Sequence, residues 1–347
     1  MCETSTPPLS RGRNLLRKCI DQQRVRLWYR WIYSESGGAT NYALEKRLMP
    51  EGFARGPDGA LSHRNRMAGY AQGKHMPRPA LVARADTLFP GSRALLDHPY
   101  WQILDPDQEL STQGAVWLAK LGSDIHRILF ARYRMAADLA ITRRKVTRAT
   151  LRQLENVGTF EALAATALLV REALEKNDAA LAFDSARSFW RVLLLIGSST
   201  PFVEYLPELA QLAASALLDR VQYRGEQVAI GTAPIRGYEG VLRCYCLALE
   251  DAERLEPDWA SWVRERLLLI RGIKGFDLLY AFQLPTVATP ELQGDPTRYS
   301  TFLREQIVRI KAFDYFTDRR WAKRSFVDDE SAFWRDPEGR WPTLEGP

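Results

Sequence analysis

The chain has 347 residues, of which 46% are hydrophobic and 26% are charged. This length predicts about two domains, and this balance is typical of a globular protein and excludes wholesale disorder. No apolar run approaches the roughly 20 residues that span a bilayer, and the first residues lack the apolar stretch of a signal peptide. We therefore expect no membrane segment and a cytoplasmic location.

The net charge of +6 is concentrated in the first 100 residues. This segment holds 16 Lys and Arg against 8 Asp and Glu, an excess of +8, whereas the remaining 247 residues carry −2. A basic excess confined to one segment predicts a polyanion as its partner. Nucleic acid is favoured over a membrane surface, because glycines and prolines interrupt the segment and prevent one long basic amphipathic helix.

Five helices are predicted in this basic segment. They cover residues 13–34, 41–48, 63–72, 79–89 and 92 to about 101. Thr40 or Asn41 can cap the second helix, and Ser62 is the expected N-cap of the third. Gly73 is a good C-terminal cap for the third helix, and Pro79 suits the first position of the fourth.

Helical patterns continue through the rest of the chain, without long strand patterns. The expected helices cover residues 112–141, 147–156, 159–176, 178–197, 201–222, 237–254, 257–273, 298–317 and 319–335. Short connections between them predict antiparallel neighbours, as in a bundle. The expected fold class is therefore all-α.

The segment SHRNRMAGYAQGKHMP, residues 62–77, carries the most functional information. Two arginines and an asparagine occupy the first turn of its predicted helix, and Met67 and Tyr70 would point inward. Gly73 would end the helix, and Pro77 follows four residues later. A helix that enters the DNA major groove needs long hydrogen-bonding side chains at its N-terminal end. Arginine can form two hydrogen bonds with guanine, and asparagine can do so with adenine.

These residues resemble the lambda-repressor/Cro-like (XRE-type) helix-turn-helix family over about residues 40–96. We therefore expect a helix-turn-helix DNA-binding domain in residues 1–105 and a helical bundle for oligomerisation, sensing or partner binding in residues 106–347. The resemblance also implies which residues contact DNA. Arg64, Asn65 and Gly69 would face the bases, whereas Ser62, Arg66, Gln72 and Lys74 would lie near phosphates.

Two features depart from the family pattern. The link between the second and third helices is about ten residues longer than the family's tight turn, and Ala71 stands where a Glu is frequent. The longer link could move the third helix out of the usual docking geometry. An alternative interpretation is that Arg64 and Arg66 are solvated side chains on a helical module that contacts another protein.

A second basic cluster follows at Arg143, Arg144, Lys145, Arg148 and Arg152, without an acid between them. One interpretation is a solvated linker between two packed units. The other is a contact with the nucleic-acid backbone, which would extend the footprint and add salt dependence.

Signals for catalysis, cofactors and metals are weak. The chain has no G-x-x-x-x-G-K, G-x-S-x-G or G-x-G-x-x-G motif, and its four Cys and four His lack metal-ligand spacing. We expect no catalytic residue, cofactor or metal. Arg93 and His98 have the R-x4-H spacing of HEPN-type ribonucleases, but Ala94 replaces the polar residue that usually follows the Arg. We interpret that spacing as chance.

Three functions remain open at this point. The first is a sequence-specific double-stranded DNA-binding protein that is not an enzyme, acting as a transcriptional regulator and forming a homodimer or binding a partner protein. The second is a non-catalytic DNA-binding or adaptor subunit of a phage-defence or mobile-element nucleoprotein complex. The third is a helical ribonuclease that acts through Arg93 and His98. Preference for one duplex sequence over random competitor would distinguish the first from the second.

Overall fold

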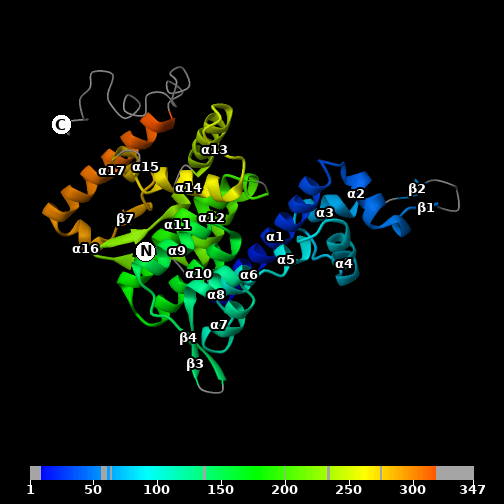
Figure 1. The fold of residues 1–347 in the computed structure, drawn as a ribbon, viewed down its shortest axis with the longest axis horizontal. Coiled ribbons are helices and arrows are strands. Elements are labelled where there is room, and N and C mark those ends of the chain that lie inside the picture. The colour runs from blue at the N-terminus through cyan, green and yellow to red at the C-terminus, as the bar shows by residue number, and fades with distance from the viewer. Residues whose placement is uncertain are drawn as a thin grey trace, which may run out of the picture. The chain divides into compact units, whose positions relative to one another are not determined.

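A computed structural model of the chain describes residues 9–55, 61–62, 65–135, 138–199, 201–232, 235–273 and 276–317. Within them the fold is all-α, as predicted, with strands that are few and short (Figure 1). The chain divides into two units. Unit 1 takes in the described parts of Met1–Lys120 and Thr200–Ala216, and unit 2 takes in those of Leu121–Ser199 and Leu217–Pro347.

Unit 1 is built from short helices around one long N-terminal helix. Its elements are α1 (Leu9–Glu35), α2 (Asn41–Leu48), the 3-10 helix η1 (Pro50–Gly52), β1 (Ala54–Arg55), β2 (Leu61–Ser62), α3 (Arg66–Ala71), α4 (Pro79–Leu88), α5 (Ser92–Leu96), α6 (Pro99–Leu104), α7 (Leu110–Ala119), η2 (Val203–Tyr205) and α12 (Leu206–Ala216). Of the two candidate caps of α2, Thr40 takes this role, since its side chain accepts the Ala43 N–H at 3.2 Å, and Asn41 is the first residue of the helix. Pro79 opens α4, as predicted.

The core of unit 1 fixes the position of α3. Apolar side chains from α1 to α5 form one buried cluster, to which α3 contributes Met67 and Tyr70. The Tyr70 ring meets the Trp28 ring of α1 edge to face, with centroids 5.6 Å apart. The prediction that Met67 and Tyr70 point inward is therefore confirmed, and the opposite side of α3 is left to face solvent.

The end of α3 requires glycine at position 73 for two reasons. Gly73 has φ +66°, a conformation that side chains disfavour, and the N–H of Lys74 donates to the Gly69 carbonyl at 2.9 Å. A Cβ at this position would also lie 2.5 Å from the Gln22 carbonyl oxygen of α1. The predicted C-terminal glycine cap is confirmed, and it also allows the turn to pass close to α1.

The start of α3 differs from the prediction. Ser62 is not its N-cap, because Ser62 lies in β2 and pairs with Ala54 of β1. The helix begins at Arg66, and its N-cap is Asn65, with φ +45° and no side-chain capping bond. The extended backbone that Ser62 would need as a cap is used instead for strand pairing in the link between α2 and α3.

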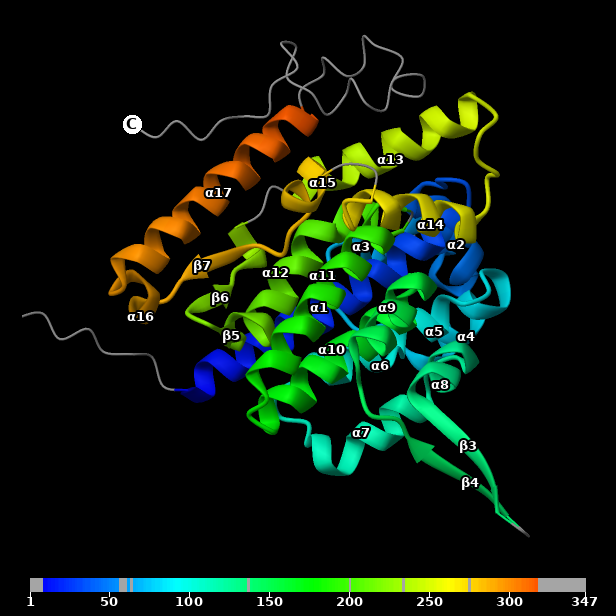
Figure 2. The same ribbon diagram turned by 60° about the vertical axis from the view of Figure 1, so that its left-hand side comes forward.

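Unit 2 contains the longest buried helices. Its elements are α8 (Ser123–Leu129), β3 (Phe130–Met135), β4 (Asp138–Arg143), α9 (Arg148–Val157), α10 (Phe160–Glu175), α11 (Ala179–Gly197), η3 (Leu218–Arg220), β5 (Gln222–Tyr223), β6 (Glu226–Val228), η4 (Ile230–Thr232), α13 (Ile235–Asp251), α14 (Trp259–Ile270), α15 (Phe276–Ala281), β7 (Thr286–Ala288), α16 (Pro290–Gln293) and α17 (Pro296–Thr317). Helices α9, α10 and α11 pack against one another (Figure 2). Helix α10 is apolar on nearly every side, which is the pattern of a buried helix.

Three of the predicted helices in this part of the chain need correction or lie outside the description. The expected helix 112–141 is wrong: Gly122 adopts extended backbone before α8, and the antiparallel hairpin β3–β4 follows from Phe130. The expected helix 201–222 is too long, because α12 ends at Ala216 and Gln222 begins the antiparallel sheet β5–β6–β7. The expected helix 319–335 lies outside the described residues.

Candidate nucleic-acid interface

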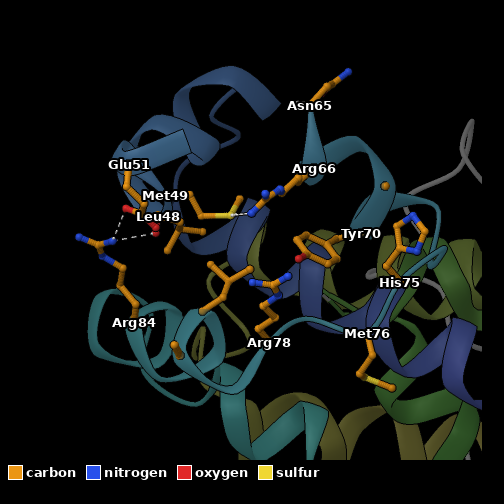
Figure 3. A pocket seen from close by; sticks show the side chains of 13 residues that line it. Leu48, Met49, Glu51, Asn65, Arg66, Tyr70, His75, Met76, Arg78 and Arg84 are labelled. Atoms are coloured by element: carbon orange, nitrogen blue, oxygen red, sulfur yellow. Dashed lines mark hydrogen bonds and ion pairs between the residues drawn. The ribbon is translucent and has the colours of Figure 1, made fainter. Parts of the chain in front are cut away.

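The outward side of α3 brings together three of the residues proposed to contact DNA. Gly69 and Gln72 are spaced i and i+3, so they share the face opposite Met67 and Tyr70. Asn65 precedes α3 as its N-cap, in left-handed backbone. Asn65 and Gln72 are exposed, and Gly69 is half-buried, with the His75 ring beside it. Figure 3 shows the Asn65 side chain directed away from the neighbouring helices. An adenine edge or a phosphate could reach this face without displacing the core.

A groove of about 610 Å³ adjoins this face. It lies between the end of α2, the start of α3, the α3–α4 turn and the first turns of α4, and Figure 3 shows three arginines on its walls. These are Arg66, Arg78 and Arg84, which we call the groove arginines. Met49, Met76 and Tyr70 also line the groove, so it combines cations with apolar surface.

The three groove arginines are neutralised to different extents. Arg84 Nη1 lies 3.2 Å from a carboxylate oxygen of Glu51 and 3.2 Å from the Leu48 carbonyl oxygen. Arg66 Nη1 approaches the Met49 sulfur at 4.0 Å. Among the residues that the structure describes, no acid lies within ion-pair distance of Arg66 or Arg78. These two guanidinium groups therefore form no ion pair with a described residue, although the buried Glu45 carboxylate acts on the same Tyr70 hydroxyl as they do.

Tyr70 responds to this charge. Burial raises the pKa of its hydroxyl, the nearby Arg66 and Arg78 lower it, and the Glu45 carboxylate raises it. The two guanidinium groups therefore act on the same small volume at the floor of the groove. An anion bound there would be stabilised by both charges, which act over longer distances where water is partly excluded.

The cations of α1 have a different environment, because residues 200–216 bring acids to them. Arg26 Nη2 lies 3.5 Å from a Glu208 carboxylate oxygen, and Arg30 pairs with Glu204. Arg26 also stacks on the Tyr205 ring, with its Cζ 4.7 Å from the ring centroid. The basic excess of the first 100 residues is therefore paired with acids on α1, whereas in the groove only Arg84 has such a pair among the described residues.

The remaining residues proposed for DNA binding lie in three different situations. Lys74 is exposed in the turn after α3. Ser62 lies in β2, and its side chain is outside the description, as is Arg64 altogether. Sequence reasoning did not single out Arg78 and Arg84. Their signal was available, since Arg84 falls outside the apolar stripe of the predicted fourth helix and Arg78 directly precedes this helix.

Arg93 and His98 each have a structural role. His98 is buried, and its Nδ1 accepts the Tyr100 N–H at 3.3 Å to cap α6. Arg93 is exposed and lies 3.5 Å from an Asp97 carboxylate oxygen within the same turn. Both residues therefore make local contacts that stabilise helix ends.

Comparison of the chain with protein-family models, with curated proteins and with solved structures gives no match. Within the described residues, no group of three or more His, Cys, Asp or Glu is arranged to hold a metal ion. None of the helices described is both long and apolar enough to cross a membrane. The geometry and charge of unit 1 are therefore the basis for the functional proposal.

Proposed function

We propose that the chain binds double-stranded DNA in a sequence-dependent manner through α3 and the groove beside it. The observation that carries this proposal is the pair Arg66 and Arg78, two guanidinium groups that form no ion pair with a described residue and lie next to Asn65, Gly69 and Gln72. The cations and Gln72 would contact phosphates, which supply affinity, and Asn65 and Gly69 would face base edges, which supply preference.

The wider proposal is a non-enzymatic transcriptional regulator that acts in the cytoplasm. DNA-binding proteins with a single short recognition helix usually bind as dimers to two half-sites, which lie one helical turn of about 34–36 Å apart. We therefore propose a homodimer, with unit 2 providing oligomerisation, sensing or partner binding. No metal or cofactor is required for such recognition.

The test compares cations that are compensated with cations that are not. We expect Arg66→Gln with Arg78→Gln to weaken binding to all duplexes and to lower the slope of log K against log salt by about 1.8, since each lost phosphate contact removes about 0.9. The matched control, Arg26→Gln with Arg30→Gln, removes the same charge from α1, where Glu204 and Glu208 already compensate it. The control should keep the wild-type slope.

Sequence preference is tested separately with Asn65→Ala. Selection of random duplexes on the full-length protein at physiological salt should enrich one motif, and Asn65→Ala should relax the preference at one base pair by about 1–3 kcal/mol. Absence of an enriched motif, or a groove variant that binds as tightly as the α1 control, would contradict the proposal.

A second candidate function is favoured by the form of α3. This helix has only six residues, and the β1–β2 hairpin replaces the tight turn that a reading helix of this family would follow. Such a helix suits an adaptor subunit of a nucleoprotein complex, which binds duplex without reading it. Steep salt dependence without an enriched motif would select this candidate.

A further inference from the structure

A second cationic surface lies in unit 2, at the base of the β3–β4 hairpin. Arg144 and Lys145 follow β4, and Arg148 and Arg152 lie one turn apart on α9. Arg144 donates its Nε–H to the Phe130 carbonyl at 3.0 Å and its backbone N–H to the Leu129 carbonyl at 2.9 Å. These bonds fix the link to the first residues of the hairpin, so the cations have a defined place.

Few acids compensate this surface. Arg143, just before it, is fully engaged, because its two Nη atoms lie 2.5 and 2.8 Å from the carboxylate of Glu172. Arg148 lies 3.1 Å from Asp184, yet 82% of its side chain is exposed. Within the described parts of the chain, Lys145 and Arg152 have no acid in ion-pair distance, and both are exposed. Positive charge therefore remains available to a partner.

The hairpin itself has the form of a duplex-binding ribbon. Its strands pair antiparallel over six residues each, from Phe130↔Arg143 to Met135↔Asp138. Figures 1 and 2 both show it extending away from the helices of unit 2. The major groove of DNA admits a two-stranded ribbon of this kind. The sequence of β3 carries Arg132 and Arg134, whereas the one acid of the two strands, Asp138, stands at the tip.

We propose that this hairpin and the cations at its base form a second DNA contact, in which Lys145 and Arg152 hold phosphates. The proposal rests on duplex DNA as the partner of unit 1 and assigns part of the salt-dependent affinity to unit 2. It does not require unit 2 to read sequence, since phosphate contacts position a protein without specifying bases.

The test uses the full chain and the enriched duplex, or one random duplex if none is enriched. Binding is measured by fluorescence anisotropy between 50 and 200 mM salt. Lys145→Gln with Arg152→Gln should lower the slope of log K against log salt by about 1.8. The loss of affinity between 50 and 200 mM salt should then be about twelvefold smaller for the variant than for the wild-type protein. Arg304→Gln with Lys311→Gln, which removes two exposed cations from α17, should leave the slope unchanged. Arg132→Gln with Arg134→Gln tests the ribbon, and an unchanged slope there would overturn its part in the contact.

The outcomes separate this inference from the proposed function. An enriched motif together with a Lys145/Arg152 variant that follows the α17 control would overturn the second contact and leave the proposed function standing. A lowered slope without any enriched motif would support the second contact and contradict sequence reading. Failure of the wild-type chain to bind any duplex would overturn both.

Discussion

The arginines of the two units have contrasting environments. In unit 2, Glu155 is 1% exposed and accepts hydrogen bonds from Ser188 at 2.7 Å, Arg191 at 3.2 Å and Arg271 at 2.7 Å, which ties α9 to α11 and to the end of α14. Arg266 is fully buried and stacks on the Trp262 ring at 4.4 Å. In the groove of unit 1, Arg66 and Arg78 have no such partners among the described residues.

This contrast shows that the number of cations in a segment does not give the charge available to a partner. Arg191 and Arg271 are separated from Glu155 by 36 and 116 residues, and Arg26 finds Glu208 far along the chain. Folding therefore decides which arginines stabilise the protein and which remain for binding.

The largest effect is expected at Glu155. Replacement by Ala would leave Arg191 and Arg271 half-buried without their carboxylate, and breaking a buried pair in this way costs about 3–5 kcal/mol. Burial already lowers the pKa of Arg191, against the effect of Glu155, so the cation is sensitive to losing it. Denaturant unfolding would measure the loss. Asp124→Ala, which removes an exposed acid paired with the exposed Arg127 on α8, is the control and should cost less than 1 kcal/mol. Equal losses would show that the Glu155 cluster is not structural.

A smaller loss is expected at Gly73, which positions the groove face. Gly73→Ala places a Cβ at φ +66° and 2.5 Å from the Gln22 carbonyl oxygen, so we expect a loss of about 2–3 kcal/mol in the stability of unit 1. The matched control is Gly240→Ala in α13, where nothing lies within 4 Å and alanine favours the helix by up to about 1 kcal/mol. Thermal unfolding would separate the two. If Gly73→Ala leaves the stability unchanged, the α3–α4 turn is free to move relative to α1.

The smallest effect concerns the buried environment of Arg266. Burial raises the pKa of the adjacent Cys246 thiol to about 11, against the lowering effect of Arg266. The pKa of this thiol is higher in the folded protein than in the unfolded chain, so deprotonation favours unfolding. The contribution of the neutral thiol to stability is therefore complete below pH 9 and declines between pH 9 and 11. Between pH 8 and 10 the free energy of unfolding should fall by about 1.4 kcal/mol from this group. Cys246→Ala should remove that part of the decline, and an unchanged pH profile would contradict it.

Much of the local structure of unit 1 follows from the sequence. Thr40, Gly73 and Pro79 act at helix ends because each residue type has a strong preference there. The start of α3 could not be predicted, since Ser62 is an equally good cap and the β1–β2 pairing depends on residues across the loop. The β3–β4 hairpin was missed because its sequence has few β-branched residues, so its helical and strand patterns are similar.

The candidate site was predictable only in part. The outward residues of α3 follow from helical spacing once Met67 and Tyr70 are recognised as core positions. The groove arginines could not be ranked, because the difference between Arg84 and Arg78 depends on Glu51, which approaches Arg84 from a separate element. Likewise, the acids that compensate α1 come from residues 200–216, whose place in unit 1 has no local signal.

The membership of residues 200–216 in unit 1 also sets the order of events during synthesis. The N-terminal unit cannot be completed when Lys120 leaves the ribosome, because α12 is translated about 80 residues later. At about 5–20 residues per second this is a delay of roughly 4–16 s. During that interval α8 to α11 emerge and can collapse first, while α1 has its arginines but not yet Glu204 and Glu208. A nascent chain would thus display its full complement of N-terminal positive charge before the mature distribution is reached.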